Sequence, residues 1–131
     1  MTMKLDLECV RDVLLTVEDC PFGERLTLEK LAAKLPDYSE EALWYTCLKL
    51  EEGELLALDT ALICKQPMPS IQRINNLTYK GHEFLANIRK DNIWAGVKAV
   101  GEKLGTSSLT ALTQIASAVA TSIIKSYFGL T

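Results

Sequence analysis

The sequence is poor in the residues that build metal centres and disulfide frameworks. It has a single histidine, His82, and its four cysteines are widely spaced, with no C-x-x-C pair among them. Because metal ligands usually converge from short spacings, we expect no metal site and no cofactor. Reduced and mostly buried thiols are expected instead, which is typical of a cytoplasmic protein.

A secretory signal and the common catalytic motifs are also lacking. Near the amino terminus Lys4 is soon followed by Asp6 and Glu8, so no apolar stretch leads to a cleavage site. No Gly-x-Ser-x-Gly motif and no phosphate-binding loop occurs. His82 and Glu83 do not form an acid/base pair, because adjacent side chains on a helix point about 100° apart. The sequence therefore predicts a protein without enzymatic activity.

Charge is distributed unevenly along the chain. Residues 1–60 carry 6 basic and 14 acidic side chains, a net charge of −8, whereas residues 61–131 carry 8 basic and 3 acidic side chains, a net charge of +5. No acidic residue lies between Thr60 and His82. Any anionic partner is therefore expected to prefer the second half of the chain.

Helical spacing of apolar residues predicts three helices in the first part of the chain. Asp6 is expected to cap the first helix and Ser39 the third, and Gly53 is the expected left-handed terminator of the third. Trp44 lies on the apolar stripe of the third helix and is expected to be a core anchor, as is Trp94 further on. The predicted ranges of the three helices are 6–19, 27–35 and 40–52.

The pattern then changes to the alternation of a β-strand. Two prolines interrupt this strand, so residues 65–70 are expected to form a loose tip and residues 71–75 the returning strand. Three helices followed by such a hairpin are the winged helix-turn-helix arrangement, in which the tip is the wing. The residues expected on the inner face of the first strand are Leu56, Leu58, Thr60, Leu62 and Cys64.

Three further helices are expected after the hairpin. Thr78 is the expected cap of the fourth helix, Asp91 of the fifth, and Ser107 or Ser108 of the sixth. Residues 81–84 are expected to pack the fourth helix onto the hairpin, with His82 hydrogen-bonded or half exposed. The fold class is thus mainly α with a small β-hairpin, a winged helix-turn-helix followed by C-terminal helices. The predicted domains are a winged-helix domain over 1–90 and a C-terminal helical appendage over 91–131.

Residues 78–94 carry a motif that resembles a known family. They read Thr-Tyr-Lys-Gly-His-Glu-Phe-Leu-Ala-Asn-Ile-Arg-Lys-Asp-Asn-Ile-Trp, similar to the family pattern Leu-Thr-x-x-Gly-His-Glu-Phe-Leu-x-x-Ile-Arg-x-Asp followed shortly by Trp. Residues 3–12 and 48–55 are similar to the same family. It consists of short bacterial and prophage-borne winged-helix proteins, mostly catalogued as a domain of unknown function. The resemblance implies the winged-helix fold and a phage or prophage setting, but no established activity.

Two functions from different classes stay open. In a winged helix the third helix lies in the major groove and its outward side chains read base edges, so a DNA-binding regulator is the first hypothesis. Four glutamates on that helix oppose a polyanion, however, and favour the alternative of a protein–protein interaction module that binds or inhibits a host or phage protein. The candidate nucleic-acid-binding residues are Tyr45, Thr46 and Lys49, expected to face outward, and Lys65, Gln66, Arg73 and Asn75 of the wing.

The last predicted helix has an unusual composition. No charge occurs from Gly105 to Ile124, but nine of these residues are Thr, Ser or Gln, which argues against a membrane span. Lys125 is the only cation after Lys103, too few for binding to an anionic membrane surface. Such a helix still needs burial, so we expect a homo-oligomer; packing on its own domain, against Trp94 and Val97, is the alternative. The candidate oligomerisation residues are Leu109, Leu112, Ala116, Val119, Ala120 and Ile123.

Overall fold

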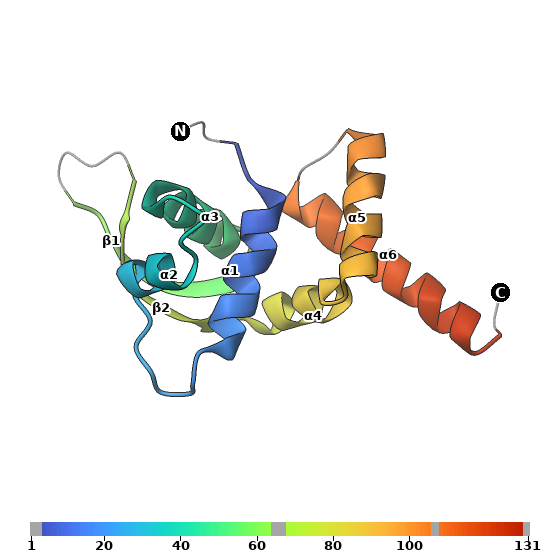
Figure 1. Cartoon of the computed structure of the whole chain (residues 1–131), viewed down its shortest axis with the longest axis horizontal. Coiled ribbons are helices and arrows are strands. Elements are labelled where there is room, and N and C mark those ends of the chain that lie inside the picture. Colours follow the sequence, from blue (N-terminus) through green and yellow to red (C-terminus); the bar gives the residue numbers. More distant parts are fainter. Residues whose placement is uncertain (1–3, 64–67, 106–107, 130–131) are drawn as a thin grey trace. The chain divides into compact units, whose positions relative to one another are not determined.

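The computed structural model describes residues 4–63, 68–105 and 108–129, which form six helices and one two-stranded antiparallel sheet (Figure 1). The chain divides into two compact units, Met1–His82 and Glu83–Thr131, called unit 1 and unit 2 below. This division falls inside the fourth helix, whereas the sequence placed a domain boundary at its end. The predicted class, mainly α with a small β-hairpin, is confirmed.

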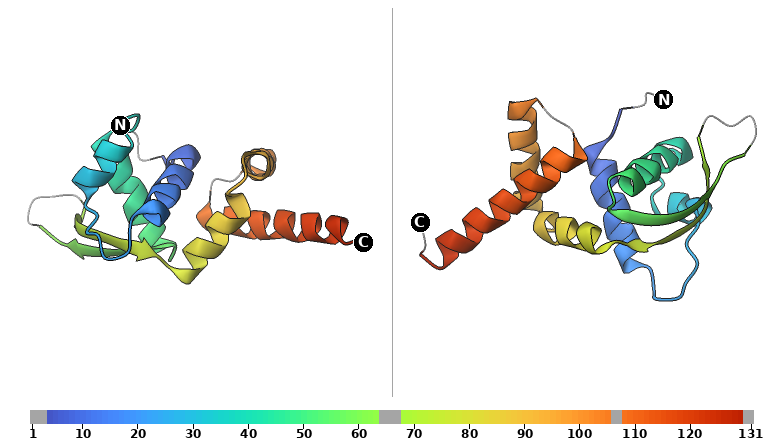
Figure 2. Two further views of the ribbon diagram at one scale, coloured as in Figure 1. Left: turned by 60° about the horizontal axis from the view of Figure 1, so that its bottom comes forward. Right: turned by 180° about the vertical axis from the view of Figure 1, so that it is seen from behind.

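Unit 1 begins with the three helices that the sequence predicted, α1 (Leu7–Asp19), α2 (Leu28–Lys34) and α3 (Glu40–Glu52). Each begins at a capping side chain, because the first backbone N–H groups of a helix have no partner within it. Asp6 accepts from the N–H groups of Glu8 and Cys9, and Ser39 from that of Ala42. Figure 2 shows the three helices on one side of the hairpin, the order and packing of a winged helix-turn-helix.

The end of α3 differs from the expectation that Gly53 is left-handed. Gly53 has a φ of −79°, and the left-handed position is taken by the next residue, Glu54, with a φ of 64°. The N–H of Glu54 donates to the carbonyl of Glu51, and the N–H of Leu55 to that of Leu50. This is the Schellman pattern, and its left-handed residue is the second one after the helix. The prediction was wrong by one position because sequence alone does not fix the last helical residue.

The hairpin pairs β1 (Leu56–Ala61) with β2 (Ser70–Leu77). Its register shifts twice, so Gln72 and Asn75 of β2 fall outside the paired positions. Bulges of this kind twist a strand and disturb the alternation of its faces. The expected inner face of β1 was therefore wrong in part, since Thr60 is exposed and Leu62, which follows the strand, is 88% exposed. Cys64 lies outside the described residues.

A third strand-like contact joins the helices to the hairpin. Leu26, just before α2, pairs with Ile74 of β2, and the N–H of Ile74 donates to the Leu26 carbonyl at 2.8 Å. Both side chains are buried. The residue that leads into α2 is thus fixed to the returning strand, which sets the position of α2 and α3 over the hairpin.

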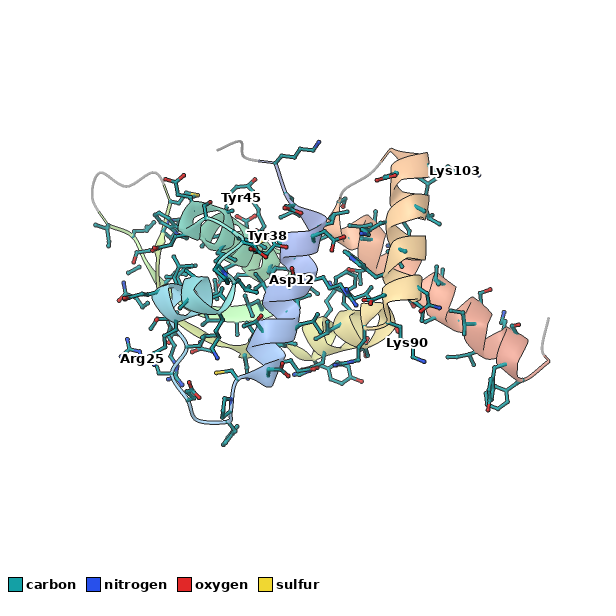
Figure 3. All side chains as sticks on the ribbon, viewed as in Figure 1. Asp12, Arg25, Tyr38, Tyr45, Lys90 and Lys103 are labelled. Atoms are coloured by element: carbon teal, nitrogen blue, oxygen red, sulfur yellow. The ribbon has the colours of Figure 1, made fainter. Side chains whose placement is uncertain are left out.

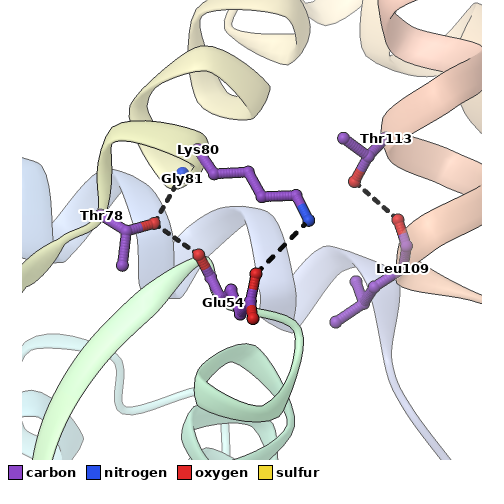
Figure 4. A network of polar contacts seen from close by, with 6 residues as sticks. All are labelled: Glu54, Thr78, Lys80, Gly81, Leu109 and Thr113. Atoms are coloured by element: carbon purple, nitrogen blue, oxygen red, sulfur yellow. Dashed lines mark hydrogen bonds and ion pairs between the residues drawn. The ribbon is translucent and has the colours of Figure 1, made fainter.

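The fourth helix, α4 (Tyr79–Ile88), begins at the base of the hairpin, where Thr78 caps it as predicted (Figure 4). The Thr78 hydroxyl donates to the Glu54 carbonyl at 2.5 Å and accepts from the Gly81 N–H at 3.0 Å. A Cβ at Gly81 would overlap the backbone carbonyl of Leu55. The first turn of α4 therefore lies against the backbone of Leu55, the residue before β1, and this close approach depends on glycine at position 81.

Unit 2 contains α5 (Asp91–Leu104) and α6 (Leu109–Tyr127), which pack against each other. Asp91, the predicted cap of α5, is instead its first helical residue; Lys90 stands at the cap without a side-chain hydrogen bond. Ser108 caps α6 as predicted, and Trp94 is buried as expected. Among the helices of the described residues, none is both long and apolar enough to cross a membrane.

Candidate functional site

The outward face of α3 brings together two of the predicted nucleic-acid-binding residues. The ammonium group of Lys49 lies 5.4 Å from the centre of the Tyr45 ring and 2.9 Å from a carboxylate oxygen of Glu52. The hydrogen bond from Lys49 to Glu52 raises the pKa of Lys49. Because both side chains are solvated, this ion pair is weak. Lys49 can therefore leave Glu52 and bind another acidic group. In the free protein, however, the Glu52 carboxylate neutralises its charge.

Thr46 does not belong to this face, and its prediction as an outward residue was wrong. It is only 2% exposed, and its hydroxyl donates to the Cys9 sulfur at 3.3 Å. Leu43, Thr46 and Leu50 follow one another at helical spacing, so Thr46 points to the interior with its two apolar neighbours. The hydroxyl fits there because the Cys9 sulfur accepts its hydrogen bond.

Of the four predicted wing residues, Arg73 and Asn75 lie apart from the α3 face. Lys65 and Gln66 lie outside the described residues. Arg73 is half-buried, and its Nε has no hydrogen-bond partner in the described part of the chain. Asn75 donates to Asp59 across the hairpin at 3.3 Å. Arg73 and Asn75 line a pocket of about 390 Å³ with residues of the α1–α2 loop, and no α3 residue is among those that line it.

A groove between α2, α3 and β2 was not predicted. It holds about 400 Å³, and two exposed acidic residues, Glu29 and Glu40, line it together with Trp44. Trp44, expected in the core, is half-buried, and its Nε1 donates to the Pro69 carbonyl at 2.7 Å. The other residues that line this groove are Thr27, Leu28, Ser70, Ile71 and Gln72.

The charge of unit 1 is acidic as a whole. Residues 1–82 carry 9 basic and 14 acidic side chains, a net charge of −5, and unit 2 carries 5 basic and 3 acidic side chains, a net charge of +2. On α3 the acidic residues Glu40 and Glu41 in the first turn and Glu52 in the last are all exposed. The positive second half that the sequence showed therefore does not make the winged-helix unit itself positive.

The predicted oligomerisation residues of α6 fall into three groups by burial. Leu112 and Ala116 are fully buried within the single chain, so they are not available to a second copy. Trp94 and Val97 are the large buried side chains of α5, which packs on α6 as the alternative prediction stated. Ile123 is 46% exposed. The other candidates, Leu109, Val119 and Ala120, are half-buried.

The described residues offer little for catalysis. They contain no cluster of three or more metal-binding side chains. His82 is half exposed, and its Nδ1 lies 3.9 Å from a carboxylate oxygen of Glu18 on α1. Cys9 and Cys47 are buried free thiols as expected, and burial raises the pKa of Cys47 to about 12, which makes it a poor nucleophile.

A polar contact inside unit 1 was also missed from the sequence. The Tyr38 hydroxyl, in the turn between α2 and α3, donates to Asp12 of α1 at 2.6 Å (Figure 3). Burial, followed by this hydrogen bond, raises the pKa of Tyr38 above its usual range. The two residues are far apart in sequence, so no local spacing reveals the pair.

These features define a winged-helix protein whose exposed surface is acidic around α3. The chain belongs to the family described as "Hypothetical protein (DUF2513)", whose family model matches residues 4–107. The match covers unit 1 from residue 4 onward, α4 and α5, and it ends before α6. No curated protein and no solved structure matches the chain. The expected family of unknown function is thereby confirmed.

Proposed function

We propose that this protein is a non-enzymatic interaction module, and that its winged-helix unit binds a basic segment of a partner protein. The single observation that carries the proposal is the groove between α2, α3 and β2. Glu29 and Glu40, which are exposed, line this groove together with the half-buried Trp44. A guanidinium or ammonium group is attracted both by carboxylates and by the face of an indole.

The electrostatics of unit 1 support a protein partner over duplex DNA. Contacts to phosphate supply most of the affinity of DNA-binding proteins, and they require basic side chains. Unit 1 has a net charge of −5, and Lys49 on the outward face of α3 is paired with Glu52. An α3 helix inserted in a major groove would bring several carboxylates close to the phosphates.

A DNA-binding regulator stays the second candidate, because the arrangement of three helices and a hairpin is the one in which α3 enters the major groove. Tyr45 and Lys49 would then reach bases or phosphates, and Lys65 and Arg73 would support them from the hairpin. A phage or prophage setting and a cytoplasmic location, which the sequence suggested, fit either candidate.

A titration with short peptides tests the first candidate. In a chain with Trp94→Phe, Trp44 is the remaining tryptophan, so its fluorescence reports on the groove. We expect an arginine-rich peptide to change this fluorescence saturably, and the same peptide with glutamine in place of arginine to leave it unchanged. Glu40→Gln should weaken binding by about fivefold, roughly 1 kcal/mol. Glu41→Gln, at the neighbouring position outside the groove, is the matched control.

The Trp94→Phe chain also distinguishes binding of a basic protein segment from binding of duplex DNA. A short duplex at low salt is titrated in parallel, and its fluorescence anisotropy is followed. The protein-binding proposal is wrong if the arginine-rich peptide leaves the Trp44 fluorescence unchanged while the duplex binds. Binding to the duplex should then weaken steeply with salt and on changing Lys65→Ala and Arg73→Ala. Equal effects of Glu40→Gln and Glu41→Gln on peptide binding would also reject the groove as the binding site.

A further inference from the structure

The C-terminal half of α6 is an uncovered apolar surface. All residues from 121 to 129 are exposed, in contrast to Leu112 and Ala116 in the first half of the helix, which are fully buried. Four large apolar side chains stand in this exposed stretch: Ile123 (46% exposed), Ile124 (56%), Tyr127 (82%) and Phe128 (67%). A soluble protein rarely exposes so many neighbouring apolar groups without a partner.

These four side chains lie on one side of the helix. Their positions, together with Ala120, follow the spacing i, i+3, i+4, i+7 and i+8, which forms a single stripe. The rings of Tyr127 and Phe128 meet edge to face with their centres 5.2 Å apart. Lys125, the only charged residue of α6, falls outside the stripe by helical geometry. We call Ile123, Ile124, Tyr127 and Phe128 the α6 stripe.

We infer that the α6 stripe is the contact surface of a homodimer in which two copies of α6 pack against each other. The stripe carries no charge, so it selects neither a polyanion nor a cationic partner, whereas a second copy matches it without an electrostatic cost. A two-fold pairing is self-complementary, and it is the commonest symmetry of soluble oligomers. The inference does not depend on the proposed function of unit 1.

The area of the stripe is sufficient for a dimer. With roughly 200 Å² for each large side chain at its exposed fraction, the four expose on the order of 500 Å² per copy. Pairing two copies then buries roughly 1,000 Å², which is the lower limit of specific interfaces. A helical end of this length without packing is marginal in water, so pairing also accounts for its helical order. We expect a dimer that dissociates on dilution.

Sedimentation equilibrium or light scattering on the full chain tests this inference, with a reductant present because the chain has four cysteines. The wild-type chain should show a concentration-dependent approach to twice its mass of 14.5 kDa. Ile124→Asp, which places a charge in the stripe, should raise the dissociation constant at least about tenfold. Ser122→Asp places the same charge on the opposite side of the same helical turn and should change little. Since all these side chains are exposed within one chain, the variants should keep the wild-type circular dichroism.

Three outcomes would overturn the inference. The first is a wild-type chain that stays monomeric up to submillimolar concentration. The second is an equal response to Ile124→Asp and Ser122→Asp, which would locate the contact elsewhere. The third is a monomer that co-sediments with phosphatidylcholine vesicles through Ile124, which would make a lipid surface the occupant of the stripe.

Discussion

Substitution of Gly81 by alanine tests how closely the first turn of α4 approaches Leu55, the residue before β1. A methyl group at this position would overlap the Leu55 carbonyl, which also accepts the Thr78 N–H at 3.2 Å. Overpacking of this kind costs about 1–3 kcal/mol, and the strained hydrogen bond about 1 kcal/mol more. The better helix propensity of alanine returns about 1 kcal/mol. We therefore expect Gly81→Ala to lower the free energy of unfolding of unit 1 by about 2 kcal/mol.

The chain offers a matched control in the other unit. Gly96 of α5 has nothing within 4 Å of the position of an added Cβ, so Gly96→Ala should raise the free energy of unfolding of unit 2 by about 0.5–1 kcal/mol. Urea unfolding is followed by the fluorescence of Trp44 for unit 1 and of Trp94 for unit 2, each in a chain where the other is phenylalanine. If Gly81→Ala is as stable as its parent, or if both variants shift stability in the same direction, then the close approach of α4 to Leu55 is wrong.

Two further substitutions in unit 1 have opposite expected effects. Glu54→Gly should raise the free energy of unfolding by about 0.5–1 kcal/mol, because glycine adopts a φ of 64° without strain. The exposed ion pair of Glu54 with Lys80, which the variant loses, contributes little. A variant less stable than its parent in the same urea assay would contradict this expectation. Tyr38→Phe should lower stability at neutral pH by about 1–2 kcal/mol, since Asp12 loses its hydrogen-bond donor. Because the folded state raises the pKa of Tyr38 above its ordinary value of 10.0, its contribution is present below that pH and is lost as the pH rises further. The difference between wild type and Tyr38→Phe should therefore shrink above pH 10, and a difference that grows there would be inconsistent with the contact.

The helices of unit 1 follow closely from local sequence. The range 40–52 and the cap Ser39 were correct for α3, because a serine before a run of helix-forming residues satisfies the first free N–H groups by itself. Thr78 and Ser108 were found in the same way. Signals of this kind lie within four residues of the feature that they predict.

Features that depend on distant residues could not be predicted. The two bulges of β2 depend on how β2 pairs with β1, and no residue within β2 marks them. Thr46 was assigned to the outer face because it is polar, yet the core provides a sulfur from Cys9 on α1 as its acceptor. The Trp44 groove needs α2 and β2 in place before it exists. Glu29 and Glu40 were visible in the sequence, but that they line one groove with Trp44 was not.

Dimerisation through the α6 stripe would affect the two candidate functions of unit 1 differently. A second copy doubles the basic side chains of the hairpin, but it also brings a second unit with a net charge of −5. For duplex DNA the added phosphate contacts are thus offset by added repulsion. For a partner with two basic segments, the second groove binds at a high effective concentration and the acidic charge assists it. If both proposals hold, Ile124→Asp should weaken binding of a tandem arginine-rich peptide far more than binding of a single one. If Ile124→Asp lowers the affinity for both peptides equally, then the substitution does not act on binding through dimerisation.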